Sequence, residues 1–154
     1  MEPQVSVELE PWGTRLEALL ARCEADRTLH MHAGGCPETE LQRIEAAVGQ
    51  PLPLPFRVFL SRLGGGVYYL KHEVFGPRRV MVHDIELVPD LLSFRHWLGD
   101  IVPRTALPIH RADGVIHVLE LGGDHPGSVR SLDEGGRRYL DFTSFLEEKL
   151  LGRG

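Results

Sequence analysis

Two histidines and a cysteine lie close together in the first third of the chain, in the segment His30-Met31-His32-Ala33-Gly34-Gly35-Cys36. Imidazole and thiolate groups bind zinc, and Cys23 is available as a fourth ligand. The spacing matches none of the usual paired-ligand patterns, and alternate histidines are equally typical of an exposed extended loop. We therefore expect solvated histidines beside a buried cysteine, and no cofactor. A metal site at His30, His32 and Cys36 is the alternative.

The segment Asp124-His125-Pro126-Gly127 also carries residues that do chemistry. A carboxylate beside an imidazole can orient a general base. The same four residue types are what a turn between two strands requires, and no serine or cysteine stands in a recognisable nucleophile elbow. We therefore predict no catalytic residues. A small metal- or histidine-dependent enzyme, with its pocket near His125 or His30, is kept as an alternative.

The three glycines Gly64-Gly65-Gly66 resemble a phosphate-binding loop only in composition. A phosphate-binding loop follows a strand, precedes a helix and ends in Gly-Lys-Ser/Thr. Here a helical pattern precedes the glycines and Val67-Tyr68-Tyr69 follows them, so the order is reversed. The glycines are predicted to end a helix and to allow a sharp turn.

Charge is distributed unevenly along the 154 residues, whose formal net charge is −5. Residues 112–148 carry eight acidic side chains against three arginines, which equals the whole net charge. A general nucleic-acid binder needs a basic surface, so the balance argues against direct nucleic-acid binding. No basic and apolar leader is visible, and no apolar run approaches a membrane span, so we expect a cytoplasmic protein with no membrane partner. The two cysteines are expected to be reduced and buried.

The elements that position these residues follow from hydrophobic spacing. A first helix is predicted from a capping box at Thr14 and Glu17. A second begins near residues 37–39, with Thr39 and Gln42 as a possible capping box, and ends at Gly49. A third begins at Pro55. The apolar stripes of the first and third helices are Trp12, Leu16, Leu19, Leu20 and Cys23, and then Phe56, Phe59, Leu60 and Leu63.

Beyond residue 66 the pattern changes to short strands separated by turns. Strands are expected at 67–70, 73–75, 79–82, 107–110, 115–121, 128–132 and 137–140, with a helix between 89 and 97. A last helix is predicted from a capping box at Ser144 and Glu147, with Phe142, Phe145, Leu146 and Leu150 inward. This order predicts one α+β domain over 1–154, with a largely antiparallel central sheet flanked by helices.

The segment from Leu52 to Gly65 reads L-P-x-x-F-x-x-F-L-x-x-x-G-G, which resembles the signature of the SUKH superfamily, a family of fungal cell-wall-synthesis regulators and bacterial immunity proteins. Leu107-Pro108-Ile109 with Asp113-Gly114 resembles a later strand and turn of that family. The resemblance covers about 37–150 and leaves 1–36 as an N-terminal helix and loop. The positions that carry its structural motif are Leu52, Pro53, Phe56, Phe59, Leu60, Gly64, Gly65, Leu107 and Pro108.

This chain departs from the family pattern at two points. Gly64 stands where the family usually has asparagine, which would exchange one left-handed helix cap for another. Val115-Ile116 stands where a second Gly-Asp is frequent, which removes a polar role from that turn.

The resemblance implies a non-enzymatic protein-binding domain. Bacterial members neutralise a cognate toxin, often a nuclease or deaminase, by binding it. A regulatory or scaffold module without a toxin partner is the alternative. A toxin directed at nucleic acid carries a basic cleft, which an acidic surface would attract. Our hypothesis places the contact on the acidic residues Asp113, Glu120, Asp124, Asp133 and Glu134, with solvated turn residues as the competing interpretation.

Overall fold

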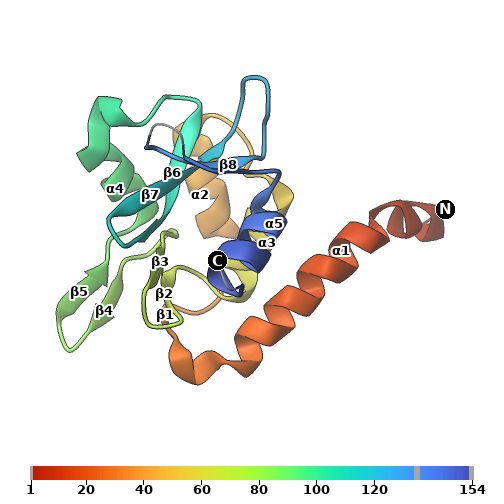
Figure 1. The fold of residues 1–154 in the computed structure, drawn as a ribbon, viewed down its shortest axis with the longest axis horizontal. Coiled ribbons are helices and arrows are strands. Elements are labelled where there is room, and N and C mark those ends of the chain that lie inside the picture. The colour runs from red at the N-terminus through yellow and green to blue at the C-terminus, as the bar shows by residue number, and fades with distance from the viewer. Residues whose placement is uncertain (1, 134–135, 153–154) are drawn as a thin grey trace.

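The computed structural model describes residues 2–133 and 136–152, with side chains from residue 13 onward within those ranges. In this part of the chain a seven-stranded antiparallel sheet forms the centre, and a separate two-stranded hairpin lies beside it (Figure 1). The hairpin strands are β4 (Val80–Val82) and β5 (Ile85–Val88). The sheet strands, in spatial order, are β1 (Met31–His32), β2 (Gly66–Tyr68), β3 (His72–Val74), β6 (Ala106–Ala112), β7 (Val115–Glu120), β8 (Val129–Ser131) and β9 (Arg138–Tyr139). This is the predicted α+β fold.

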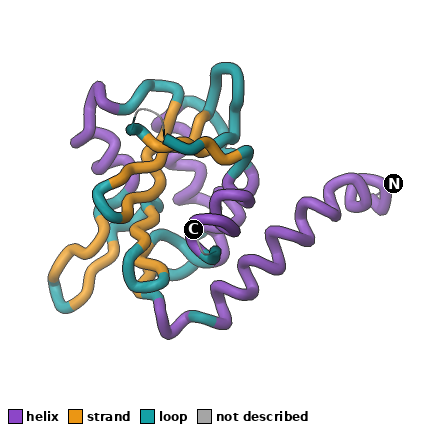
Figure 2. Tube along the Cα trace, viewed as in Figure 1, coloured by secondary structure: helices purple, strands orange, loops and turns teal. Residues whose placement is uncertain are grey.

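Helices lie on both sides of the sheet (Figures 1 and 2). On one side α3 and α5 pack together, and the N-terminal half of the long helix α1 projects away from the body of the molecule. On the other side α4 packs against β6 above the β4–β5 hairpin. The helices are α1 (Glu2–Ala25), α2 (Glu38–Val48), α3 (Leu54–Arg62), α4 (Leu91–Leu98) and α5 (Phe142–Phe145). Single turns are η1 (Arg27–Leu29), η2 (Gly99–Ile101) and the π-helical turn η3 (Leu146–Leu150). None of the described helices is both long enough and apolar enough to cross a membrane.

The predicted apolar stripes form the core. In α1 the stripe is buried from Leu16 to Cys23, while the Trp12 side chain lies outside the described residues. Phe59 of α3 meets Phe142 of α5 edge to face, with ring centroids 5.3 Å apart. Burial of large aromatic side chains at this contact supplies much of the apolar area that stabilises the domain. The motif residues buried with them are Leu52, Phe56, Phe59, Leu60, Gly64, Gly65, Leu107 and Pro108, and Pro53 is half-buried.

All three predicted capping boxes are wrong. Helix α1 begins at Glu2, so Thr14 lies in its interior, and Glu17 instead pairs with Arg62 at 2.8 Å. Pro37 precedes α2 without a side-chain cap. At α5 the cap is Asp141, which accepts the Ser144 N–H at 2.8 Å. A Ser/Thr-x-x-Glu/Gln pattern satisfies free N–H groups only at the start of a helix. These three helices start at other residues, so the pattern does not cap them.

Helix α3 begins one residue before the predicted Pro55, at Leu54, and the left-handed Gly49 ends α2 as predicted, with φ of 80°. Two strands were not predicted. Met31–His32 forms the edge strand β1 where a loop was expected, and Ile85–Val88 forms β5. Strands this short have no periodicity of their own and form because β2 and β4 pair with them.

A bulge in β6 decides which side chains share a face of the sheet. Pro108 is opposite Val118, but His110 is opposite His117, so one extra residue lies between the two pairs. A bulge of this kind turns the following side chain to the other face. It places His110 on the face that α5 covers, where its ring lies 5.0 Å from that of Phe145.

Candidate protein-binding surface

The sheet has one face that helices α3 and α5 do not cover, which we call the open face. Residues directly opposite in an antiparallel sheet lie on the same face. The pairs Met31–Val67, Val67–Glu73, Glu73–Arg111 and Arg111–Ile116 therefore form a row across five strands. Met31 is exposed and the other four are half-buried. The row mixes apolar and charged side chains, as protein-binding surfaces do.

A groove of about 390 Å³ opens beside this row, between β5, α4 and β6. Trp97 lines this groove. Its side chain is 75% exposed, although its ring stacks on that of Phe94 with 6.0 Å between the ring centroids. A tryptophan this exposed places a large apolar surface in water. We call this site the Trp97 groove, and it is lined by Glu86, Leu87, Pro89, Ser93, Phe94, Trp97 and Arg111.

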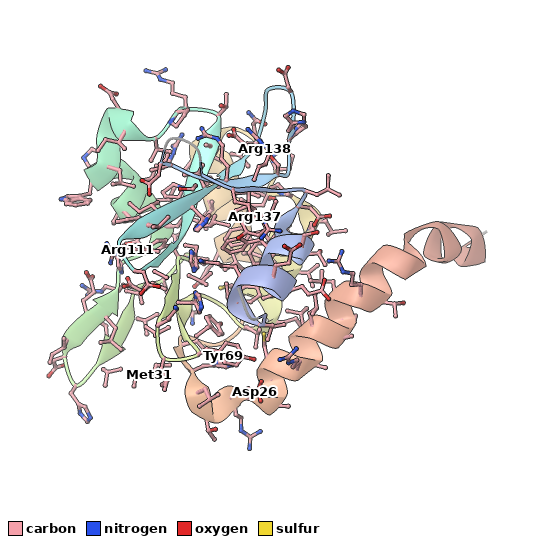
Figure 3. All side chains as sticks on the ribbon, viewed as in Figure 1. Asp26, Met31, Tyr69, Arg111, Arg137 and Arg138 are labelled. Atoms are coloured by element: carbon pink, nitrogen blue, oxygen red, sulfur yellow. The ribbon has the colours of Figure 1, made fainter. Side chains whose placement is uncertain are left out.

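Arg111 is held in place inside the groove, where α4 approaches the hairpin (Figure 3). Its Nη2 and Nε donate to Glu73 Oε1 at 2.6 and 3.2 Å. Its guanidinium carbon lies 5.0 Å from the Phe94 ring centroid and 5.7 Å from that of Phe75, which is within cation–π distance. An arginine fixed in this way loses little conformational entropy when a partner docks.

Two further apolar side chains are exposed, one at the β2–β3 turn and one in the β4–β5 hairpin. Leu70 is 71% exposed at the β2–β3 turn, and its N–H bonds to Leu29 O at 3.1 Å. Its φ of 66° is a left-handed conformation that a branched residue rarely adopts. Ile85 is 64% exposed in the hairpin. Backbone strain combined with exposed apolar side chains is a feature of binding sites.

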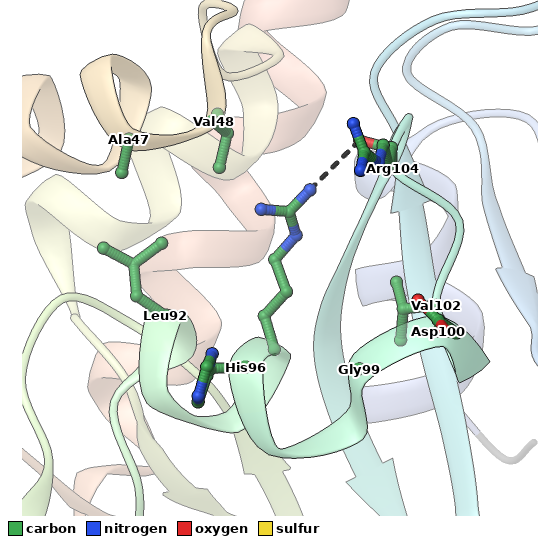
Figure 4. Close-up of a pocket in the computed structure, with 9 residues that line it drawn as sticks. Ala47, Val48, Leu92, His96, Gly99, Asp100, Val102 and Arg104 are labelled. Atoms are coloured by element: carbon green, nitrogen blue, oxygen red, sulfur yellow. Dashed lines mark hydrogen bonds between the residues drawn. The ribbon is translucent and has the colours of Figure 1, made fainter.

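A second cavity, of about 570 Å³, lies between the end of α2 and α4 (Figure 4). Arg95 crosses it and donates to Arg104 O at 3.1 Å. Asp100 and His96 lie on its rim, and neither Trp nor Phe lines it. Of these two cavities, the Trp97 groove is the one lined by aromatic side chains.

The predicted zinc-ligand candidates are engaged in hydrogen bonds. His30 Nδ1 accepts the Tyr69 N–H at 3.1 Å, and its Nε2 lies 3.0 Å from Cys23 O, which fixes the proton on Nε2. His32 Nδ1 accepts the Gly34 N–H at 3.1 Å. Nearby, the Tyr69 hydroxyl donates to Asp26 at 2.7 Å, at the C-terminal end of α1 (Figure 3). These bonds attach β1 and its preceding turn to the core.

The two thiols are buried, as predicted for reduced cysteines, and both are free. Burial raises the pKa of Cys23 and of Cys36 to about 11, so neither is a thiolate near neutral pH. In the described residues no three His, Cys, Asp or Glu side chains are grouped closely enough to hold a metal ion.

The acidic residues predicted to contact a partner are not gathered into one patch. Asp113 pairs with Lys71 at 3.0 Å in the β6–β7 turn, and Asp133 is exposed just beyond β8, at the same end of β7. Asp124 is exposed in the turn at the opposite end of β7. Glu120 is paired with Arg130 and has little exposure. Glu134 lies outside the described residues.

Two other acidic groups of the 112–148 region are paired with arginines. Arg15 of α1, outside this region, binds Glu147, and Arg137, within it, binds Glu148. The pairs with Arg15 and Lys71 therefore neutralise part of the local acid excess. Asp124 and Asp133 have no ion-pair partner within the described residues. A role for the acidic residues in partner contact stays a prediction.

Asp124-His125 occupies the predicted turn, where His125 is exposed and its carbonyl accepts the Ser128 hydroxyl at 2.8 Å. Neither of the two cavities is lined by His125 or His30. The titratable side chains that sequence reasoning missed are His72, His110 and His117, which meet in the core. Strand alternation in the sequence could not predict this cluster, because the β6 bulge decides which face His110 lies on.

Comparison with known proteins supports the fold. No known family's sequence model matches the chain, and no curated protein matches it. Among solved structures it is similar to a protein from Pseudomonas syringae pv. tomato, with a TM-score of 0.66 and 18% sequence identity. The match covers 88% of this chain and 98% of that one. At this identity the likeness establishes the shared α+β architecture alone, and the resemblance to the SUKH superfamily stays a prediction.

Proposed function

We propose that this protein is a non-catalytic binding domain of the immunity type, which neutralises a cognate toxin domain by direct contact. The observation that carries the proposal is the Trp97 groove, with an exposed tryptophan beside a fixed arginine. The sequence resemblance supplies the class of partner, a nuclease- or deaminase-type toxin. The same contact would serve a regulatory module without a toxin, so the partner must be tested directly.

Tryptophan and arginine are the residues most enriched at the energetic centres of protein interfaces. Covering Trp97 removes a large apolar surface from water, and Arg111 offers a cation already oriented by Glu73. The open face continues the surface along the row from Met31 to Ile116. A stable complex buries roughly 800 Å² per partner, so the proposal requires the partner to cover both the groove and this row.

The acid excess adds a long-range attraction in this proposal. A net charge of −5 draws a basic toxin domain toward the protein before contact, even though individual carboxylates are paired. Reversing Asp124 and Asp133 together, as D124K and D133K, avoids the half-buried Glu120–Arg130 pair. We expect association to slow severalfold at low salt and dissociation to change little. Unchanged association across salt concentrations would remove the acidic residues from the mechanism.

The function is tested by protection from toxicity. Where a neighbouring gene encodes a nuclease- or deaminase-type toxin domain, that domain is expressed in a host cell with and without this chain. The proposal predicts that growth is restored by the wild-type chain and that the two proteins co-purify in a stable ratio. Persistent toxicity with both proteins folded and expressed would contradict the immunity function. Restored growth without co-purification would instead favour an enzymatic or indirect route.

A further inference from the structure

Three buried histidines are hydrogen-bonded in series across β3, β6 and β7. His72 Nδ1 lies 2.9 Å from His110 Nε2, and His110 Nδ1 lies 3.1 Å from His117 Nδ1. His110 is fully buried, and His72 and His117 are 5% and 4% exposed. Both ring nitrogens of His110 therefore bond to another imidazole, and no backbone group intervenes.

The number of protons in this series is limited by its geometry. Each of the two N···N bonds needs one proton between the rings. With three neutral rings, His110 donates to one neighbour and accepts from the other. One added proton leaves both bonds intact, whether His110 then donates in both directions or the proton occupies the outer nitrogen of His72 or His117. A second added proton places two N–H groups against each other and breaks a bond, with two positive charges in the core.

The C-terminal segment covers this series directly. The Phe145 ring lies 5.0 Å from His110 and 5.0 Å from His117, and Tyr139 of β9 is 5.1 Å from Phe145. Helix α5 has only four residues and continues as the π-helical turn η3. Among the described residues the buried Thr143 hydroxyl has no hydrogen-bond partner, which costs stability. The segment is attached to the sheet side through Phe145, to α3 through Phe142, and to α1 through Arg15 and Arg22.

Charged groups of both signs surround the histidines, and the lysines affect their pKa more than the aspartates do. Lys149 of η3 and Lys71 of the β2–β3 turn disfavour protonation, while Asp113 and Asp133 favour it. Burial is the largest cause of the lowered pKa of all three imidazoles. Lys149 belongs to the covering segment itself, so positive charge on the rings repels that segment.

We propose that His72, His110 and His117 form an acid-sensitive latch, which holds residues 142–151 against the sheet and releases them when the series takes up protons. Release hydrates the protonated rings, frees Phe145 and separates Lys149 from the new charge. Because Arg15 binds Glu147 and Arg22 donates to Leu151 O, release also loosens the attachment of α1. This latch is independent of the proposed toxin binding.

Hydrogen exchange measured by mass spectrometry between pH 7.5 and 5, corrected for intrinsic exchange rates, tests the latch. We expect protection of residues 142–150 to fall about tenfold or more relative to that of α2, which does not touch the latch. The variant H72L/H110L/H117L removes the titrating groups and leaves no unpaired imidazole. This variant should make the protection of residues 142–150 relative to that of α2 independent of pH. Exposed His125, replaced in H125Q, is the control and should leave the wild-type response unchanged.

An equal loss of protection in both segments, or no loss in either, would overturn the latch, as would a wild-type response in the triple variant. If the triple variant does not fold, nitrogen-15 NMR of the wild-type imidazoles decides. The latch requires protonation of the imidazoles and rising exchange at residues 142–150 to occur over the same pH interval. Protonated imidazoles with an unchanged, protected α5 would contradict it.

Discussion

The two faces of the central sheet use polar side chains in opposite ways. On the face covered by α5, three imidazoles are excluded from water and bond only to one another, in the neutral state that burial favours. On the open face, Glu73 and Arg111 pair with each other and retain contact with solvent. In our proposals this difference separates two tasks. The covered face would hold the fold together in an acid-sensitive way, and the open face would present side chains to a partner.

The largest predicted effect concerns pH and the covered face. Burial lowers the pKa of His72 and of His117 to about 4, from an ordinary value of 6.5. Unfolded chains therefore take up protons first as pH falls. The stability conferred by the neutral rings is complete above about pH 6.5 and is lost progressively toward pH 4. At pH 5 the lowered pKa of each of these two histidines reduces the free energy of unfolding by about 2 kcal/mol. Urea unfolding should therefore give a much smaller free energy of unfolding at pH 5 than at pH 7.5.

A stability that is flat from pH 7.5 to 5 would show that the imidazoles accept protons in the folded state without cost. The triple apolar variant H72L/H110L/H117L provides the matched comparison. Its free energy of unfolding should lose most of the pH dependence over this interval.

The next prediction compares the loss of stability when one aromatic ring is removed from each face. Phe145→Ala removes a fully buried ring in contact with His110 and His117, and we expect it to lower the free energy of unfolding by about 3–5 kcal/mol. Trp97→Ala removes a larger but mostly exposed ring and should cost less than about 1 kcal/mol. Chemical denaturation at pH 7.5 measures both, and similar losses would contradict the division between the faces.

A smaller effect is predicted for two glycines with the same backbone conformation. Gly64 and Gly49 both have φ of 80°, but a Cβ at Gly64 would lie 2.1 Å from Gly34 O, whereas none of the surrounding atoms is within 4 Å at Gly49. Gly64→Ala should therefore cost about 2–3 kcal/mol, and Gly49→Ala about 1 kcal/mol from backbone strain alone. Thermal or urea unfolding compares them. Equal costs would mean that the segment at Gly34 moves away freely.

This glycine also changes what the sequence pattern implied. Gly64 stands where the resembled family usually has asparagine, and an exchange of left-handed caps was expected to be neutral. The close approach of Gly34 to Gly64 is a contact between segments far apart in sequence. Local rules for caps contain no information about it, so the cost of a side chain here is visible only in the fold.

Apolar spacing was sufficient to predict the helices and the antiparallel sheet. Phe56, Phe59 and Leu60 recur at helical intervals, and their burial needed no knowledge of the partner strands. The candidate site was not predictable in this way. Trp97 was assigned to a helix without indication that it would remain exposed, and Arg111 follows a strand prediction that ended one residue earlier. Both line one groove because α4 packs against β6, a tertiary contact that local patterns do not contain.

The acidic residues also show that sequence composition alone does not determine the surface. Their excess between 112 and 148 is a true property of the sequence, yet the fold pairs Glu147 with Arg15 from the first helix. Composition therefore overstated the acidity of that surface. Asp124 and Asp133 are the members of the predicted set that are exposed and unpaired among the described residues, and they are the ones to reverse.

The central claim, that the Trp97 groove binds the partner, is tested most directly by calorimetry with a toxin domain against which this chain protects cells, by measuring the dissociation constant of their complex. Trp97→Ala should weaken binding about 30-fold or more, the loss typical of an interface centre, while the variant stays folded. Leu140→Ala is the matched control, because Leu140 is 82% exposed beyond β9 and outside the groove. It should leave the affinity within about twofold. Equal affinities for wild type and Trp97→Ala would contradict the account and move the contact to another surface.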